Sequence, residues 1–149
     1  MKLVPRFFTF QQALELLPQV ESVIRDAIAF KSEYQEAETA WQDFQRRVMM
    51  QGGVLVDHAQ LLDRKNRREV SVQHLKEALE KIQEYGCLVK DLDVGLIDFP
   101  TLLHGEEVYL CWKLGETGIS FWHGVHEGFR GRKPIDREFL DNHQGERPN

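Results

Sequence analysis

The side chains of this sequence that could do chemistry gather between residues 95 and 132. Asp98 interrupts the apolar stretch Leu-Ile-Asp-Phe, and a carboxylate that is buried must be paired or hydrogen-bonded. His123 ends a run of apolar and aromatic residues, and neutral imidazole is the commonest metal ligand. Asp98, Glu116 and His123, with His126 as a possible addition, therefore predict a divalent metal site, which would suit a hydrolytic reaction.

Each of these residues also has a purely structural interpretation. Asp98 would bind backbone amides or an arginine inside the protein. His123 would make a single hydrogen bond at the edge of the core. Glu116 would stay exposed in its turn or form a salt bridge to Arg130 or Arg132.

Arg130 and Arg132 are candidates for binding an anionic ligand, because guanidinium groups bind carboxylates and phosphates. Gly128 and Gly131 would let the backbone approach such an anion, and Trp112 is a further candidate for contact with a ligand. The sequence has no HExxH, paired CxxC, phosphate-binding glycine loop or GxSxG motif. The motifs therefore leave the reaction class open.

A glycine-bounded loop at residues 115–118 predicts how the last two strands pair, with Leu114 facing Ile119. Side chains alternate between the two faces of a strand. One face would then carry Leu110, Trp112, Leu114, Ile119, Phe121 and His123. Cys111 would lie on the other face. The register of the preceding connection stays open, so the sequence does not say whether Asp98 shares the face of this histidine.

From Cys87 onward the apolar residues alternate with a period of two, which indicates strands. We expect about four strands, over residues 87–90, 96–99, 108–114 and 119–123, joined by short turns as an antiparallel meander. Pro100 should limit pairing at the end of the second strand.

The first half of the chain predicts long helices. Thr9 and Gln12 fit a capping box, and Pro18 should kink or break the helix, which then continues to about Gln51. Its apolar stripe recurs every three or four residues, at Leu17, Val20, Ile24, Ala27, Phe30, Tyr34, Ala37, Trp41, Phe44 and Val48. A helix of roughly 50 Å needs an antiparallel helix, another subunit or both to cover it.

Gly52-Gly53 should end this helix, and a second helical arm should follow over 54–70 and from Ser71 to Tyr85, with a break possible at 66–71. Gly86 suits the C-terminal cap. A basic cluster on this arm lacks interleaved aromatic residues, so we expect a solvated helix face and no nucleic-acid binding. Its members are Arg64, Lys65, Arg67 and Arg68.

Length and composition predict a single domain of 149 residues with a net charge of −5, which disfavours a general binder of phosphate backbones. We expect a helical hairpin over 9–86, a sheet over 87–124 and a polar extension that frays beyond about residue 140. No apolar run is long enough for a membrane span and no signal core precedes Pro5, so the expected location is the cytoplasm. Cys87 and Cys111 would then be reduced thiols.

Several motifs together resemble a bacterial and archaeal family catalogued as a domain of unknown function, number 2203. They are Arg6-Phe7-Phe8-Thr9, Gly95-Leu96-Ile97-Asp98-Phe99-Pro100, Leu110-Cys111-Trp112-Lys113-Leu114-Gly115-Glu116, and Trp122-His123 followed by Gly128-Phe129 and Arg132. The resemblance covers roughly residues 6 to 135. It implies a fold unit and a bacterial source, and no activity.

These observations predict an α+β protein, with a long, coiled-coil-like antiparallel helical hairpin and a small antiparallel meander at one end. The heptad-like stripe favours a homodimer through the helical arms. Two functional hypotheses follow. The protein is a non-enzymatic oligomerising or binding module, or it binds a divalent metal or an anionic ligand, with hydrolysis as a possible activity.

Overall fold

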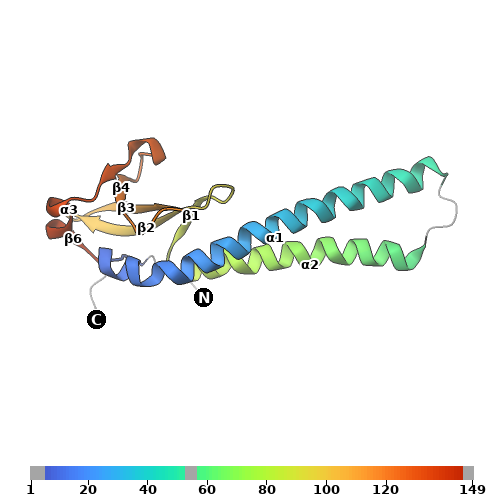
Figure 1. The fold of residues 1–149 in the computed structure, drawn as a ribbon, viewed down its shortest axis with the longest axis horizontal. Coiled ribbons are helices and arrows are strands. Elements are labelled where there is room, and N and C mark those ends of the chain that lie inside the picture. Colours follow the sequence, from blue (N-terminus) through green and yellow to red (C-terminus); the bar gives the residue numbers. More distant parts are fainter. Residues whose placement is uncertain (1–5, 53–56, 146–149) are drawn as a thin grey trace.

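A computed structural model describes residues 6–52 and 57–145. A long helical hairpin projects from one end of an antiparallel sheet, which confirms the predicted α+β class (Figure 1). The elements are α1 (Phe10–Met50), α2 (His58–Glu84), β1 (Leu88–Asp91), β2 (Leu96–Leu103), β3 (Glu106–Lys113), β4 (Phe121–Gly124), the 3-10 turn η1 (Phe129–Gly131), β5 (Lys133–Pro134), α3 (Arg137–Asn142) and β6 (His143–Gln144).

Helix α1 begins at the predicted capping box, in which the Thr9 side chain accepts from the Gln12 backbone and the Gln12 side chain accepts from the Thr9 backbone. It runs through Pro18 as one element, so the break that we considered does not occur. The helix ends at Met50, and Gly52 takes a φ of +70° that favours glycine. Gly53 lies outside the described residues.

Helix α2 is also one element, without the break considered at 66–71. Asp57 caps it by accepting from the backbone amides of Ala59 and Gln60. The start predicted at Ser71 is wrong, because the Ser71 hydroxyl donates to the Arg67 carbonyl in the helix interior, 2.7 Å away. Residues 54–56 of the predicted arm lie outside the described residues.

The hydrophobic core lies between one face of the sheet and the inner part of the hairpin. Helix α1 contributes Ala13, Leu17, Val20, Val23, Ile24 and Ala27, and α2 contributes Ala78 and Ile82. The sheet contributes Ile97, Phe99, Val108, Leu110 and Trp112. Apolar burial at this end of the hairpin therefore fixes the helices against the sheet.

The outer half of the hairpin is held differently. Of residues 28–50, all of which the structure describes, only Phe44 is buried. The guanidinium of Arg64 lies 5.0 Å from the Phe44 ring and that of Arg68 lies 5.4 Å from the Trp41 ring. Arg64 and Arg68 therefore face α1, whereas Lys65 and Arg67 are exposed, as the prediction of a solvated face has it.

None of the helices that the structure describes combines the length and the apolar character that a membrane crossing requires.

The sheet has the order β1-β2-β3-β4-β5, with β6 also paired to β2, so the predicted meander gains two short strands. Pro100 does not end β2, because it pairs with Tyr109 and the strand continues to Leu103. Its carbonyl accepts from Phe8 N at 2.7 Å, on the side away from β3. The missing amide of Pro100 faces that same side, so the β2–β3 ladder loses no hydrogen bond.

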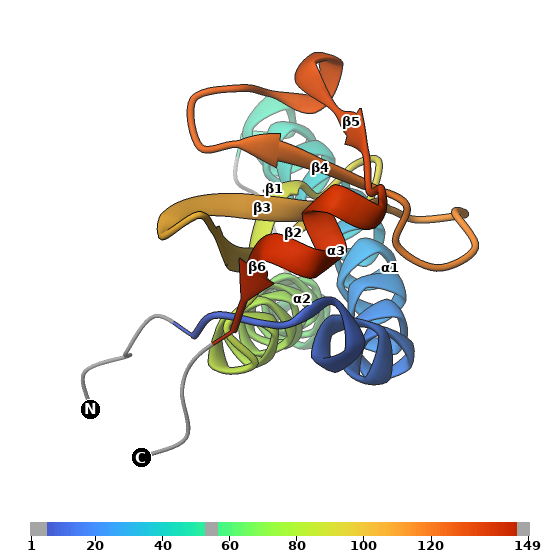
Figure 2. The ribbon, with the colours of Figure 1, turned by 90° about the vertical axis from the view of Figure 1, so that its left-hand side faces the viewer.

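The part of the C-terminal extension that the structure describes beyond residue 140 is folded, whereas we expected fraying there. His143 and Gln144 form β6 against Leu103 and Leu102 of β2. The ring Nε2 of His143 accepts from Phe10 N at 2.9 Å, which places this segment beside the start of α1 (Figure 2). The two ends of the described chain thus meet at one edge of the sheet.

Candidate metal centre

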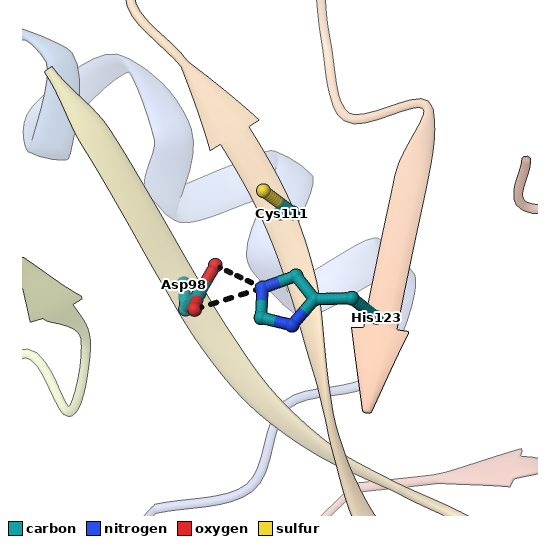
Figure 3. Close-up of side chains that lie close together, drawn as sticks. All are labelled: Asp98, Cys111 and His123. Carbon is teal, nitrogen blue, oxygen red and sulfur yellow. Dashed lines mark hydrogen bonds and ion pairs between the residues drawn. The ribbon is translucent and has the colours of Figure 1, made fainter. Parts of the chain in front are cut away.

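Three adjacent strands bring together Asp98 of β2, Cys111 of β3 and His123 of β4 (Figure 3). Asp98 pairs directly with Cys111, and His123 pairs with Tyr109, two residues before that cysteine. Residues at this spacing share a face of the sheet. That face is opposite the one that packs on the helices, so the cluster is separate from the main apolar core.

The predicted register of the last hairpin is wrong by one residue. The structure pairs Cys111 with Phe121 and Tyr109 with His123, whereas the predicted pairing placed His123 opposite Leu110. The pairing with β4 stops at Cys111, and β3 itself ends at Lys113, whose amide donates to a carboxylate oxygen of Glu116 at 2.7 Å. A one-residue shift moves every side chain to the other face, so His123 leaves the core row and joins Cys111.

Hydrogen bonds fix the ring of His123 on both sides. Its Nδ1 lies 2.8 Å from the Gly124 carbonyl oxygen, which can only accept, so Nδ1 carries a hydrogen. Its Nε2 lies 3.0 Å from each carboxylate oxygen of Asp98. The contact between Nε2 and the carboxylate therefore needs one further proton, carried either by the histidine or by the aspartate.

The cluster has the composition of a metal-ligand set. One donor atom each from Asp98, Cys111 and His123 lies within 4.8 Å of the others. Tetrahedral zinc bound by nitrogen, oxygen and sulfur, with bonds of about 2.0 to 2.3 Å, places its donors about 3.3 to 3.7 Å apart. Small side-chain adjustments would therefore let the three donors share one ion.

The hydrogen bonds that the candidate ligands make with neighbouring groups also suit a metal. A metal-binding histidine usually donates its other ring N–H to a carbonyl or carboxylate, as Nδ1 of His123 does to Gly124. The Oδ2 atom of Asp98 is buried and has no hydrogen bond of good geometry to any described residue. Oδ2 is thus an acceptor position that a cation would use, and Nε2 of His123 would exchange its contact with Asp98 for the ion.

Burial controls the charge state of the cluster. Asp98 and Cys111 are fully buried and His123 is 4% exposed. Burial raises the pKa of Asp98 above its usual range, and the neighbouring His123 opposes part of that shift. Burial, helped by the negative charge of Asp98, raises the pKa of the Cys111 thiol to about 12. A protonated thiol is a poor nucleophile, so the geometry does not suit thiolate catalysis.

Tyr109 covers the cluster. Its ring makes an edge contact with the His123 ring at 5.6 Å between centroids, and it is itself 7% exposed. The Lys90 ammonium lies 4.7 Å from the Tyr109 ring centroid. The tyrosine ring therefore contacts both the imidazole and a solvent-exposed lysine.

Glu116, which we predicted as a metal ligand, has other partners. Both of its carboxylate oxygens accept from Nη2 of Arg132, at 2.9 and 2.7 Å, and one also accepts from the Lys113 amide. This is the salt bridge that we had considered as its structural role. The Arg132 guanidinium carbon lies 4.0 Å from the Phe121 ring centroid and 4.6 Å from that of Phe129. The predicted anion clamp thus holds a carboxylate of the protein itself.

The remaining predicted site residues lie apart from the cluster. Trp112 is fully buried on the core face, where its Nε1 donates to the Glu116 carbonyl at 3.1 Å. His126 and Arg130 are exposed in the segment between β4 and β5. Cys111 was not among the predicted ligands, because the one-residue error in the predicted register placed it on the face opposite His123.

The fold and the cluster define an α+β protein with an elongated helical hairpin and a buried Asp–Cys–His group in its sheet. Comparison with protein families confirms the resemblance noted above. The chain belongs to the family described as an uncharacterized conserved protein, DUF2203, which matches residues 6–135. Neither the curated proteins nor the solved structures gave a match.

Proposed function

We propose that this protein binds one divalent transition-metal ion, with zinc the best match, through Asp98, Cys111 and His123. The observation that carries the proposal is the convergence of a carboxylate, a thiol and an imidazole within 4.8 Å. Nitrogen and sulfur donors favour zinc over magnesium or calcium, which prefer oxygen.

Charge balance supports a divalent ion at this buried position. Without metal, the protonated Cys111 and the proton shared by Asp98 and His123 leave the cluster neutral. A divalent ion that replaces those two protons would leave the group neutral again, with a thiolate, a carboxylate and a neutral imidazole. The interior would therefore never hold an uncompensated charge, which is costly to bury.

Burial favours a structural or sensing role for the ion over a hydrolytic one. A structural zinc site is closed by four protein ligands, whereas three ligands leave a fourth position open, as in catalytic zinc sites. Burial would keep a substrate from that fourth position here. The three side chains are at most 4% exposed, and Tyr109 lies over the histidine. The ion would join three strands of the sheet, so its binding would stabilise the fold.

Metal analysis tests the proposal directly. The untagged protein is stripped with a chelator, reloaded with Zn²⁺ or Co²⁺, and analysed for bound metal. We expect one ion per chain, and a Co²⁺ spectrum with the thiolate charge-transfer band and strong visible absorption of a tetrahedral site. The spectrum is measured on the wild-type protein, so this test does not depend on whether any variant folds. A chain that binds neither ion stoichiometrically would overturn the proposal.

Four variants identify the ligands. Cys111→Ser should abolish the thiolate band, and His123→Ala should abolish binding. The exposed His126→Ala is the matched histidine control and should bind normally. Glu116→Gln tests the ligand set predicted from sequence. Loss of metal in Glu116→Gln together with retention in Cys111→Ser would replace Cys111 by Glu116 in the site.

A second candidate function is self-association through the helical arms, and a separate observation supports it. The outer part of α1 carries half-buried apolar side chains such as Tyr34 and Val48, while α2 presents Arg64 and Arg68 to it. Two helices alone thus leave the outer stripe incompletely covered. Sedimentation or light scattering should find a dimer at micromolar concentrations, and a monomer there would exclude this function.

A further inference from the structure

The outer half of the hairpin has a groove on one side, between α1 and α2. Its floor consists of small or exposed apolar side chains, Ala37 and Ala40 of α1 and Val70 of α2, and Val70 is 49% exposed. Small side chains let another helix approach closely, at the 8 to 10 Å typical of packed helices. The groove therefore has the shape and the apolar character of a helix-docking surface.

Charge is distributed unevenly along this groove. Glu33 and Glu36 of α1 line it, and so does Arg67 of α2. Helix α1 runs away from the sheet and α2 returns, as the contacts of Phe30 with His74 and of Phe44 with Arg64 show. The glutamates therefore lie at the end nearer the sheet and the arginine at the end nearer the tip.

We propose that the occupant of this groove is the same groove of a second copy, docked antiparallel. The inference rests on the arm association proposed above and adds its face and direction. In an antiparallel pair, Glu33 of each copy lies level with Arg67 of the other, while Glu36 lies beside the axis. A parallel pair would place like charges together, which is unfavourable.

Self-complementarity is the reason to choose a second copy over another partner. In a two-fold dimer the same patch serves both subunits, so residue i contacts residue j and j contacts i. This groove carries an acidic end and a basic end on either side of an apolar middle, which is the pattern such an interface needs. The axis would pass near Ala37 and Val70, and the two sheets would lie at opposite ends of the dimer.

Disulfide trapping tests the direction and the face. Ala37→Cys lies at the proposed axis and should form a dimer with itself on mild oxidation. Glu33→Cys should not link to itself, because its two copies lie on opposite sides of the axis. It should link instead to Arg67→Cys when the two variants are mixed. Gln35→Cys, exposed on the opposite side of the same helix, is the matched control and should stay monomeric under oxidation.

The outcomes separate this inference from the association on which it rests. Wild-type protein should give no disulfide dimer, because Cys87 and Cys111 are buried. A dimer in solution that traps through Gln35→Cys, or through Glu33→Cys with itself, would overturn the antiparallel groove and leave association standing. A monomer in solution would overturn both. Ala40→Cys provides a second probe of the groove should Ala37→Cys fail to fold, and it should link less readily than a residue at the axis.

Discussion

The side chains of Asp98, Cys111 and His123 would have to release two protons to bind a divalent ion. Burial favours the protonated forms, since it raises the pKa of Asp98 and raises that of Cys111 to about 12. Protons and metal therefore compete for the same atoms. This competition gives the site a pH dependence of known sign.

We predict that the apparent affinity for Zn²⁺ increases as pH rises, by up to about 100-fold per pH unit where two protons leave for each ion bound. Competition with a chromophoric chelator, corrected for the chelator's own titration, measures the slope between mildly acidic and mildly alkaline pH. The Cys111→Ser variant loses one of the protons and should show a shallower slope. An affinity independent of pH would contradict the assigned ligands.

Both thiols should react slowly in the folded protein. Burial raises the pKa of Cys87 to about 12, as it does that of Cys111, and the thiolate is the reactive form. We predict that alkylation by iodoacetamide near neutral pH is slower than in the unfolded chain by at least about 100-fold. Mass spectrometry of peptides resolves the two sites. A cysteine that reacts at the unfolded rate would show that its burial is wrong.

The sequence identified part of the candidate site and not all of it. Asp98 and His123 stood out because a carboxylate and an imidazole within apolar strands demand partners. Cys111 did not stand out, because a cysteine in an apolar strand is an ordinary core residue. Its role depends on which residue faces which across the loop between β3 and β4, where the Glu116 side chain accepts from the Lys113 amide. Such a contact cannot be read from periodicity.

At the scale of elements, Gly95 shows how tightly the turns are packed. It has a φ of +71°, and an added Cβ would lie 2.5 Å from the Leu114 Cβ. Its carbonyl also accepts from the Leu114 amide, at 3.0 Å. The turn between β1 and β2 is thereby fixed against the end of β3.

We predict that Gly95→Ala lowers the free energy of unfolding by about 2 to 4 kcal/mol, from the steric overlap and the unfavourable φ. Gly105→Ala is the matched control, because its φ of +80° is similar but nothing lies within 4 Å of the added Cβ. It should cost about 1 kcal/mol. Urea denaturation of the two variants measures the difference, and equal costs would refute the close packing at Leu114.

Elements long enough to show a repeating apolar pattern could be predicted, and shorter elements could not. Helices α1 and α2 and four strands follow from repeating apolar positions, and Thr9 marks the start of α1 as expected, whereas the six-residue α3 was not predicted. Strands β5 and β6 have two residues each, too few for any periodicity. Pro100 misled the analysis because its effect depends on which side of the strand its missing amide faces. On that side Phe8, from the far end of the chain, donates to the Pro100 carbonyl.

At the scale of the whole molecule, stability should fall along the hairpin. Residues 13–27 of α1 pack on the sheet, whereas most of residues 28–50 depend on α2 and, as we propose, on a second copy. Amides that lie in weakly packed regions open more readily. The two parts of one helix should therefore respond differently to dilution.

We predict that dilution below the dimer dissociation constant speeds hydrogen exchange at least about 10-fold in residues 28–50 and in the facing part of α2. Exchange in residues 13–27 should stay unchanged, and this segment serves as the internal control. Mass spectrometry of proteolytic fragments resolves the two segments. Exchange that is fast in the outer arm at every concentration would show that no partner copy covers it.

The closure of the β2 edge has a consequence for how the chain is made. The carbonyl of Pro100 is bonded to Phe8, and residues 102 and 103 pair with β6, which follows them by about forty residues. On the ribosome, β2 and β3 emerge well before His143, so part of β2 then presents free peptide groups. Such an open edge recruits other strands. The nascent chain is therefore most exposed to aggregation between the synthesis of β3 and that of β6, when chaperone binding would matter most.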